Sequence, residues 1–175
     1  MSYPPRVRVL ILGDSNAVAM GPLLAERLTA AGHEVHQLAK HGRGASWWTR
    51  RGWWRVKRTV QQLEPDALIA IFGAKNDSAD RRFETAVRKL GGALPRGRVI
   101  WIGSPSYRRD RLQRRADRLL KMVRAVMGDR LIDSHPHTDP RDVPRTPDGI
   151  HVTKGGARRW ADSIAPEVEA ALEAD

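Results

Sequence analysis

The sequence has no cysteine and no apolar run long enough to span a membrane. The absence of cysteine excludes disulfide frameworks, thiolate nucleophiles and zinc sites built on thiolates, and it leaves the redox compartment open. The apolar run Val7–Leu12 is too short for the hydrophobic region of a secretory signal, and the polar residues 13–16 interrupt it. We therefore expect a soluble chain with neither an export signal nor a membrane span.

Positive charge is what the sequence has in excess. The 31 lysines and arginines outnumber the 20 aspartates and glutamates, which gives a formal net charge of +11. Such a charge raises the affinity for anionic partners such as nucleic acid, acidic glycans or anionic lipid surfaces. The alternative is an arginine-rich chain without such a partner. The 175 residues and the apolar fraction of 41% suit a single folded domain over residues 1–175.

Short apolar runs alternate with longer amphipathic segments along the chain. The strands that we expect are Val7–Leu12, Val35–Ala39, Ala67–Phe72, Val99–Gly103 and Leu131–Asp133. The helices that we expect are Pro22–Ala31, Trp53–Leu63, Asp80–Leu90, Asp110–Met127 and Thr153–Leu172. Three of the strands are continuously apolar, which is typical of strands buried on both faces of a parallel sheet. The alternation predicts a doubly wound α/β fold with a five-stranded parallel sheet.

A candidate nucleophile follows the first strand, in the sequence Gly13-Asp14-Ser15-Asn16. A serine at the carboxyl end of a strand can expose its hydroxyl at the edge of a crevice, where backbone N–H groups favour negative charge. A nucleophilic serine also needs a base to take its proton. The alternative interpretation of this tetrapeptide is a turn with a side-chain cap.

A candidate base lies near the other end of the chain, in Asp148-Gly149-Ile150-His151. A histidine three residues after an aspartate can be oriented by it through Nδ1–H, which leaves Nε2 to act as general base. The preceding stretch Ser134–Gly149 is rich in Pro, Asp and His and has no periodicity. Long irregular loops in compact domains are more often functional than structural.

Two further loops, His41–Ser46 and Gly73–Asp77, follow the second and third strands. An acyl-transfer site must stabilise an oxyanion with fixed hydrogen-bond donors. Gly44 could supply a backbone N–H and Asn76 a side-chain amide. In a parallel sheet the carboxyl ends of the strands share one edge, so the fold would bring these loops together with Ser15. They complete a set of nucleophile, base, orienting acid and oxyanion donors.

These four segments resemble the four sequence blocks of the SGNH (GDSL-like) hydrolase superfamily, in the same order and over nearly the whole chain. The resemblance implies a flavodoxin-like three-layer α/β/α sandwich and the hydrolysis of esters, often acetyl esters of sugars or acyl esters of lipids. It implies that Ser15 is the nucleophile, that Asp148 and His151 complete the triad, and that the Ser15, Gly44 and Asn76 amides form the oxyanion hole. It implies no metal and no organic cofactor.

The third block departs from the family pattern, which is usually Gly-x-Asn-Asp. Here Ala74 and Lys75 separate Gly73 from Asn76. Either the loop is one residue longer, or Ala74 occupies the glycine position. In the second block Gly42 is a rival to Gly44, which we prefer because the following Ala-Ser pair fits the family pattern.

Six tryptophans could contribute to the core or to substrate binding. Helical spacing places Trp53 and Trp160 in the core, and Trp101 lies within an apolar strand. The remaining Trp47, Trp48 and Trp54 lie among Arg50, Arg51 and Arg55. They predict an aromatic wall for a sugar ring or an acyl chain, or else a cover over the loop–helix junction.

Two other charged segments have ordinary explanations. His135 and His137 do not match a metal-ligand spacing, so we expect no metal there. The arginines of 108–124 occupy several helix faces, which predicts a solvated surface or a docking surface for an anionic partner.

The sequence therefore predicts a serine esterase, with a small-molecule or glycan acetyl ester as the expected substrate. The alternative is an inactive binding or structural module of the same fold for an anionic polymer. A nucleotide-binding domain is disfavoured because no Gly-rich loop follows the first strand. Extracellular glycan deacetylation does not agree with the missing export signal, so we expect a cytoplasmic or phage-particle location.

Overall fold

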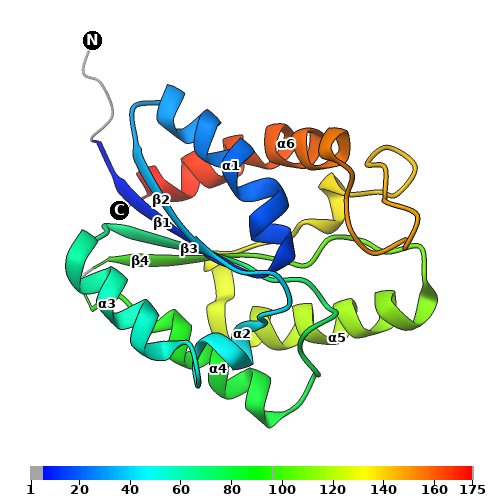
Figure 1. The fold of residues 1–175 in the computed structure, drawn as a ribbon, viewed down its shortest axis with the longest axis horizontal. Helices are drawn as coiled ribbons and strands as arrows, with labels where there is room; N and C mark the ends of the chain where they lie inside the picture. Colours follow the sequence, from blue (N-terminus) through cyan, green and yellow to red (C-terminus); the bar gives the residue numbers. More distant parts are fainter. Residues whose placement is uncertain (1–5, 96, 175) are drawn as a thin grey trace.

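The computed structural model describes residues 6–95 and 97–174, which form a five-stranded sheet between two layers of helices (Figure 1). The strands are β1 (Arg8–Gly13), β2 (Glu34–Ala39), β3 (Ala67–Ile71), β4 (Arg98–Ile102) and β5 (Leu131–Ile132). The helices are α1 (Ser15–Ala30), α2 (Ala45–Trp48), α3 (Trp53–Leu63), α4 (Arg81–Gly91), α5 (Asp110–Met127) and α6 (Lys154–Glu173). Two short 3₁₀ turns, Gly128–Arg130 and His135–His137, flank β5.

The sheet is parallel throughout, in the order β2-β1-β3-β4-β5. This is the flavodoxin-like order, so the predicted three-layer fold is confirmed. In this order β1 and β3 lie side by side in the middle of the sheet, and their carboxyl ends adjoin the topological switch point. Ligands bind at that edge in open α/β sheets. Gly13 and the loop after Ile71 therefore lie where a crevice is expected.

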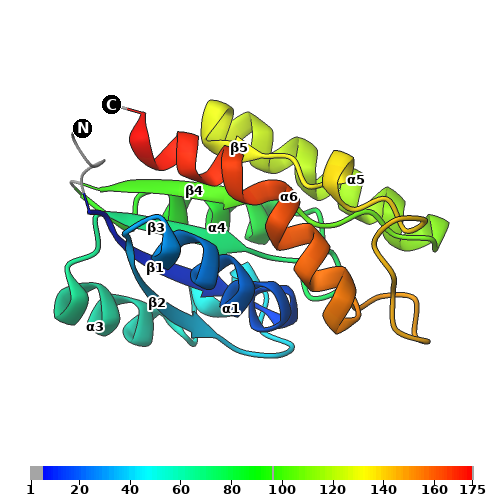
Figure 2. The same ribbon diagram turned by 90° about the horizontal axis from the view of Figure 1, so that it is seen from above.

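The apolar core is divided by the sheet into two layers. Helices α1 and α6 pack against each other on one face, and α2, α3, α4 and α5 cover the other (Figures 1 and 2). Successive residues of β1 alternate between these layers: Leu10 and Leu12 belong to one cluster, Val9 and Ile11 to the other. Strand side chains alternate in this way because their period is two residues. Burial of both faces explains why the strand is continuously apolar.

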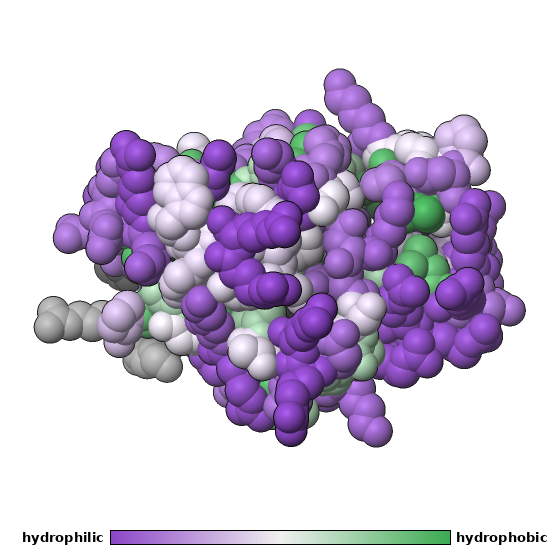
Figure 3. All heavy atoms as spheres, turned by 60° about the horizontal axis from the view of Figure 1, so that its bottom comes forward, coloured by the Kyte–Doolittle hydropathy of each residue, from purple (hydrophilic) through white to green (hydrophobic). Residues whose placement is uncertain are grey.

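Helix positions follow from capping and from apolar spacing. Asp80 caps α4 through the N–H groups of Arg82 and Phe83, and Thr153 caps α6 through Gly156. In α5 the buried residues Ala116, Leu119, Val123 and Met127 recur at helical spacing, while the arginines face outward. Figure 3 shows the resulting surface, on which hydrophilic side chains surround small apolar areas.

Most of the predicted elements are confirmed, and two features of the prediction were wrong. All five strands agree within one residue at either end, and the helices 53–63 and 110–127 agree at both ends. The first helix begins at Ser15 rather than Pro22, because Asp14 caps it. Pro22 lies inside this helix. The second difference is α2, a single turn that was not predicted.

Among residues 6–95 and 97–174, no helix combines the length and the apolar character needed to cross a membrane.

Candidate active site

Ser15 is the first residue of α1, directly beyond the end of β1. Gly13 permits this tight junction, because a Cβ there would lie 2.0 Å from the Ile71 carbonyl oxygen and 2.6 Å from the Ala17 Cβ. Ser15 is 8% exposed. Its backbone N–H donates no hydrogen bond to any residue that the structure describes. The serine therefore has a free N–H at the positive end of a helix, which favours a developing negative charge.

Asp14, the neighbour of Ser15, connects the first and third loops. Its buried carboxylate accepts hydrogen bonds from the backbone N–H and the side-chain amide of Asn16 at 2.9 and 3.2 Å. It also accepts from the Gly73 N–H at 3.0 Å and from the Asn76 amide at 3.1 Å. Burial raises the pKa of Asp14, and these four hydrogen bonds oppose the rise. Asp14 thus fixes the position of Asn76 relative to the start of α1.

The lengthened third loop is accommodated without losing Asn76. Gly73 is the position at which only glycine fits, since a Cβ there would lie 2.1 Å from the Asn16 side-chain nitrogen. Ala74 is fully buried and donates its N–H to the Tyr107 hydroxyl at 3.2 Å, while Lys75 points into solvent. Gly73 therefore requires glycine, while the side chain of Ala74 is accommodated next to it. One N–H of the Asn76 amide bonds to Asp14, which leaves the second available.

Gly44 approaches Asn76 from the second loop. A Cβ at Gly44 would lie 2.3 Å from the Asp77 carboxylate and 3.0 Å from the Asn76 Cβ. Asp77 is buried and accepts hydrogen bonds from the Ala45 and Ser46 N–H groups at 2.7 and 3.1 Å, which holds the start of α2 against the third loop. In the described part of the chain the Gly44 N–H has no acceptor. Gly44 and Asn76 therefore place two donors side by side.

Asp148 and His151 form a close pair in the loop before α6. Nδ1 of His151 lies 2.6 Å from the Asp148 carboxylate, which also accepts hydrogen bonds from the Thr146 hydroxyl at 2.6 Å and the Ile150 N–H at 2.8 Å. These bonds, led by that of Thr146, hold the pKa of Asp148 well below its usual range. The His151 Nε2 makes no hydrogen bond within residues 6–95 and 97–174. It is the nitrogen that can accept a proton.

The loop of His151 is fixed to the body of the protein at several points. The Arg145 guanidinium donates to the carbonyl groups of Val143, Ser106 and Thr138. Arg145 itself forms an isolated antiparallel bridge with Val152. Val152 and Ala17 belong to the same apolar cluster, so the residues beside His151 and Ser15 share one packed layer. In the described structure no hydrogen bond joins the Ser15 hydroxyl to His151.

No protein-family model matches the chain, and no curated protein matches it in sequence. Solved structures do match. The psychrotrophic esterase EstA from Pseudoalteromonas sp. has a TM-score of 0.72 at 16% identity, over 95% of this chain and 99% of that one. A protein assigned as a GDSL-like lipase from Parabacteroides merdae has a TM-score of 0.68 at 14% identity, over 97% and 98%.

A third match is the family 3 carbohydrate esterase from Clostridium thermocellum, with a TM-score of 0.69 at 13% identity over 97% of this chain and 100% of that one. The fold is that of the SGNH hydrolases. Within this SGNH fold the candidate residues of all four blocks occupy loops and helix starts at the carboxyl edge of the sheet.

Several residues of the candidate site were not predicted from the sequence. Asp14 and Asp77 hold the two donor loops, Thr146 binds Asp148, and Arg145 fixes the loop that carries them. Asp14 lies two residues before a helical N–H that it accepts, a spacing typical of an N-cap, and this signal could have revealed the early start of α1. Asp77 and Arg145 act across 32 and 39 residues and leave no local signal, whereas Thr146 lies only two residues before Asp148.

Trp47, Trp48 and Trp54 do not form the single aromatic surface that was predicted as one of two alternatives, because they differ in burial. Trp48 is 1% exposed and donates its indole N–H to the Gly13 carbonyl at 3.1 Å, so it belongs to the core. Trp47 is half-buried against it with Arg43 stacked on its ring at 4.8 Å, and Trp54 is 55% exposed beneath Arg55. Trp53, expected in the core, is only half-buried at its margin.

A second serine–histidine pair lies on the surface of the SGNH fold. The Ser163 hydroxyl lies 2.7 Å from Nδ1 of His137, and the Glu167 carboxylate lies 2.6 Å from its Nε2. Ser163 is in the middle of α6, where backbone N–H groups are bonded within the helix and cannot stabilise an oxyanion. This trio therefore lacks the donors that surround Ser15. No group of three or more His, Asp or Glu residues in the described chain is arranged to hold a metal ion.

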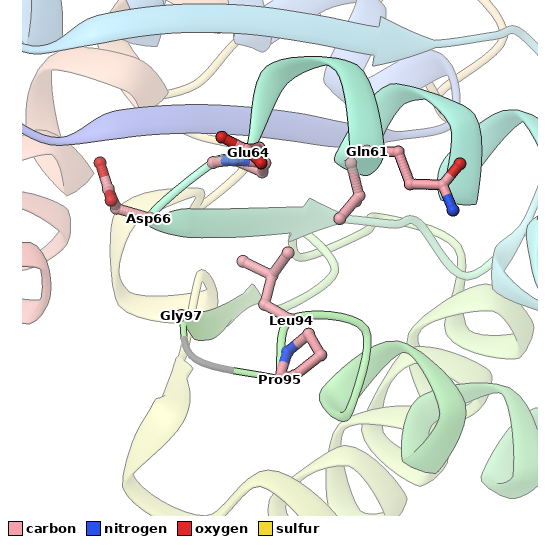
Figure 4. A pocket seen from close by; sticks show the side chains of 8 residues that line it. Gln61, Glu64, Asp66, Leu94, Pro95 and Gly97 are labelled. Atoms are coloured by element: carbon pink, nitrogen blue, oxygen red, sulfur yellow. The ribbon is translucent and has the colours of Figure 1, made fainter.

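A cavity of about 530 Å³ lies at the opposite edge of the sheet (Figure 4). It is bounded by the end of α3 at Glu64 and by the connection between α4 and β4 at Leu94 and Pro95. Asp66 and Gly97, which line it, directly precede β3 and β4. It therefore adjoins the amino ends of the strands and contains none of the candidate catalytic residues.

Proposed function

We propose that this chain is a serine esterase that cleaves carboxylic esters through an acyl-enzyme. The observation that carries the proposal is the Asp148–His151 pair, which leaves Nε2 of the histidine free at the sheet edge where Ser15 begins α1. If Asp148 and His151 were only a surface ion pair, there would be no reason for hydrogen-bond donors to gather at the same sheet edge. The N–H groups of Ser15 and Gly44 and the Asn76 amide lie there. Together these groups supply a nucleophile, a base and oxyanion donors.

In the first half-reaction His151 takes the Ser15 hydroxyl proton on Nε2, and the serine oxygen attacks the ester carbonyl carbon. The carbonyl oxygen becomes an oxyanion that accepts hydrogen bonds from the Ser15 and Gly44 N–H groups and the Asn76 amide. Asp148, kept ionised by its hydrogen bonds, stabilises the imidazolium through Nδ1–H. The imidazolium then protonates the departing alcohol, which leaves the acyl group on Ser15.

In the second half-reaction water replaces the alcohol. His151 removes a proton from the water, which attacks the acyl carbon through the same oxyanion arrangement. Collapse of this intermediate returns the proton to Ser15 and releases the carboxylic acid. All of these steps use groups of the chain itself.

An acetyl ester of a carbohydrate is the proposed substrate. The family 3 carbohydrate esterase and an acetyl xylan esterase, which also matches at a TM-score of 0.68 and 19% identity, support this choice by their names. The half-buried Trp47 with Arg43 on its ring offers an apolar and cationic neighbour to the Gly44 loop. Such a surface suits a sugar ring better than a long acyl chain.

The test is hydrolysis of an aryl acetate by the purified chain and by single variants. We expect Ser15→Ala and His151→Ala each to lower kcat by about 10⁴-fold or more, as loss of a triad member does elsewhere. Ser163→Ala, which removes the other histidine-bonded serine, is the matched control and should leave kcat unchanged. Wild-type protein that neither hydrolyses short acyl esters nor reacts with a fluorophosphonate would overturn the proposal.

Two other uses of the same site are distinguishable. Acetyltransferase domains also match the fold, so the acyl group on Ser15 could pass to a sugar hydroxyl instead of water. Product analysis with an added glycan acceptor separates transfer from hydrolysis.

The net charge of +11 favours the binding module for an anionic polymer as a second candidate. Salt-sensitive polymer binding by the wild type, kept in Ser15→Ala and without any turnover, would support that alternative.

A further inference from the structure

A small cavity of about 170 Å³ lies between the start of α5 and the loop that carries His151. Its lining is Arg109, Arg111, Leu112, Arg115 and Ile150. Leu112 and Ile150 are half-buried and pack against the apolar core, so they form an apolar floor. The three arginines surround this floor. Small apolar areas enclosed by hydrophilic side chains are visible on this face of the molecule (Figure 3).

The three arginines lack partners within the protein. In residues 6–95 and 97–174, none of their guanidinium groups forms an ion pair or a hydrogen bond, whereas Arg124 and Arg141 are paired with Asp133 and Asp139. Of the nearby acidic groups, Asp117 accepts from Gln113, and Asp148 from Thr146 and His151. Asp110, next to Arg109 and Arg111 in the sequence, is exposed and forms no ion pair with them in residues 6–95 and 97–174. Like charges around one small cavity repel each other, and an anion between them would relieve that repulsion.

The cavity adjoins the segment that carries the candidate base. Ile150 directly precedes His151, whose Nε2 protonates the departing alcohol in the proposed reaction. The oxyanion donors Gly44 and Asn76 belong to the second and third loops, which do not line the cavity. A group bound here would lie next to the segment of the histidine that protonates the departing alcohol, and not against the second and third loops.

We propose that this cavity is a subsite for a carboxylate carried by the alcohol part of the substrate. The inference rests on the proposed esterase function. Guanidinium groups bind carboxylates through two parallel hydrogen bonds, and the apolar floor accommodates the carbon atoms next to the charge. The substrate class is accordingly an ester of an acidic alcohol, such as a uronate sugar or a phenolic acid, with a short acyl group.

The experiment compares two acetate esters that differ only in charge, 4-acetoxybenzoate and 4-acetoxybenzamide. The quantity measured is the ratio of the two kcat/KM values, benzoate over benzamide, in the wild type and in each variant. The intrinsic reactivity of each ester is the same for every protein, so it cancels when these ratios are compared. We expect the double variant Arg111→Gln/Arg115→Gln to lower this ratio at least about tenfold, mainly through KM for the benzoate. That is the size expected for losing one charge-assisted hydrogen bond.

The matched control is Arg114→Gln/Arg118→Gln. It removes the same charge from the same helix, but both residues are exposed and neither lines the cavity. We expect it to change the ratio by less than about twofold, since surface charges at a distance act weakly. An equal decrease in both double variants would overturn the subsite in favour of a general electrostatic field.

Binding of the product separates failure of the subsite from failure of the esterase proposal. In Ser15→Ala protein, 4-hydroxybenzoate should bind more tightly than 4-hydroxybenzamide, and Arg111→Gln/Arg115→Gln should remove the difference. An esterase that hydrolyses both esters without this binding preference contradicts the subsite alone. If the protein hydrolyses neither ester, the proposed esterase function is contradicted. The subsite proposal then fails as well, because it rests on that function.

Discussion

The side-chain amide of Asn76 donates a hydrogen bond of 3.1 Å to the carboxylate of Asp14, 62 residues earlier in the chain. This contact fixes the one loop whose sequence departs from the SGNH pattern. The same carboxylate oxygen accepts the Gly73 N–H at 3.0 Å, so a single group holds the residues on both sides of Ala74 and Lys75. The Asn76 amide is thereby fixed to the start of α1.

Loss of the Asn76 amide should slow the chemical step. We expect Asn76→Ala to lower kcat by about 10²–10³-fold with little change in KM, because an oxyanion donor acts in the transition state. Lys75→Gln, in the adjacent exposed position, is the control and should retain activity within about twofold. Steady-state kinetics on an aryl acetate provide the measurement. An Asn76→Ala variant as active as the control would remove Asn76 from the oxyanion hole.

The Asp14 carboxylate should be needed even though it does not touch the substrate. In Asp14→Asn an amide N–H₂ would face donors in place of one carboxylate oxygen, leaving at least one buried N–H unsatisfied. We expect the free energy of unfolding to fall by about 2 kcal/mol, measured by urea denaturation, and kcat to fall with the displaced Asn76. A fully active Asp14→Asn variant of wild-type stability would show that the carboxylate is dispensable.

The Thr146 hydroxyl should determine the protonation of Asp148. Its hydrogen bond is the largest cause of the lowered pKa of Asp148. A lowered pKa in the folded state favours folding above the ordinary carboxyl pKa of about 4, and this contribution is lost as the pH falls further. Thr146→Val should raise the pKa of Asp148 toward that ordinary value and decrease kcat, since His151 is then less well oriented.

The check on Thr146 is an NMR titration of the Asp148 carboxyl carbon in wild type and variants. Thr146→Ser keeps the hydroxyl and should titrate like the wild type. If the Asp148 titration is unchanged in Thr146→Val, the N–H groups of Ile150 and His151 are enough to keep the pKa of Asp148 low, and the Thr146 hydroxyl is not needed.

How much of the site could be read from the sequence depends on the range of each contact. The strand pattern located Ser15, Gly44, Asn76 and His151 at one sheet edge, because a parallel sheet leaves no other arrangement. The start of α1 was predicted at Pro22, seven residues too late, because Asp14 caps the helix at Ser15. The consequence concerns the site: Ser15, the proposed nucleophile, lies at the N-terminus of a helix, and its N–H has no acceptor among residues 6–95 and 97–174.

Contacts between distant loops were beyond the sequence. Trp48 was grouped with Trp47 and Trp54 because tryptophans next to arginines suggest a binding surface. In the structure its indole instead reaches the Gly13 carbonyl, 35 residues earlier. The links from Asp14 to Asn76 and from Arg145 to Ser106 are of the same kind. None of them has a local spacing that would reveal it.

The burial of Trp48 gives a prediction about stability rather than activity. Trp48→Ala should lower the free energy of unfolding by about 3–5 kcal/mol, because it opens a cavity in the core and removes the indole hydrogen bond to the Gly13 carbonyl. Trp54→Ala, at an exposed position, should change it by less than about 0.5 kcal/mol. Urea unfolding of both variants is the measurement, and equal losses would contradict the assignment of Trp48 to the core.

The choice between Gly44 and Gly42 as the second oxyanion donor can be decided by alanine at each position. An alanine Cβ at Gly44 would lie 2.3 Å from the Asp77 carboxylate, so it must displace either the third loop or its own N–H. We expect Gly44→Ala to lower kcat by about 10²-fold or more. At Gly42 a Cβ meets nothing within 4 Å, and the only cost is its φ of +69°, about 1 kcal/mol of stability. Gly42→Ala should therefore be less stable but active, and the reverse pattern would transfer the donor role to Gly42.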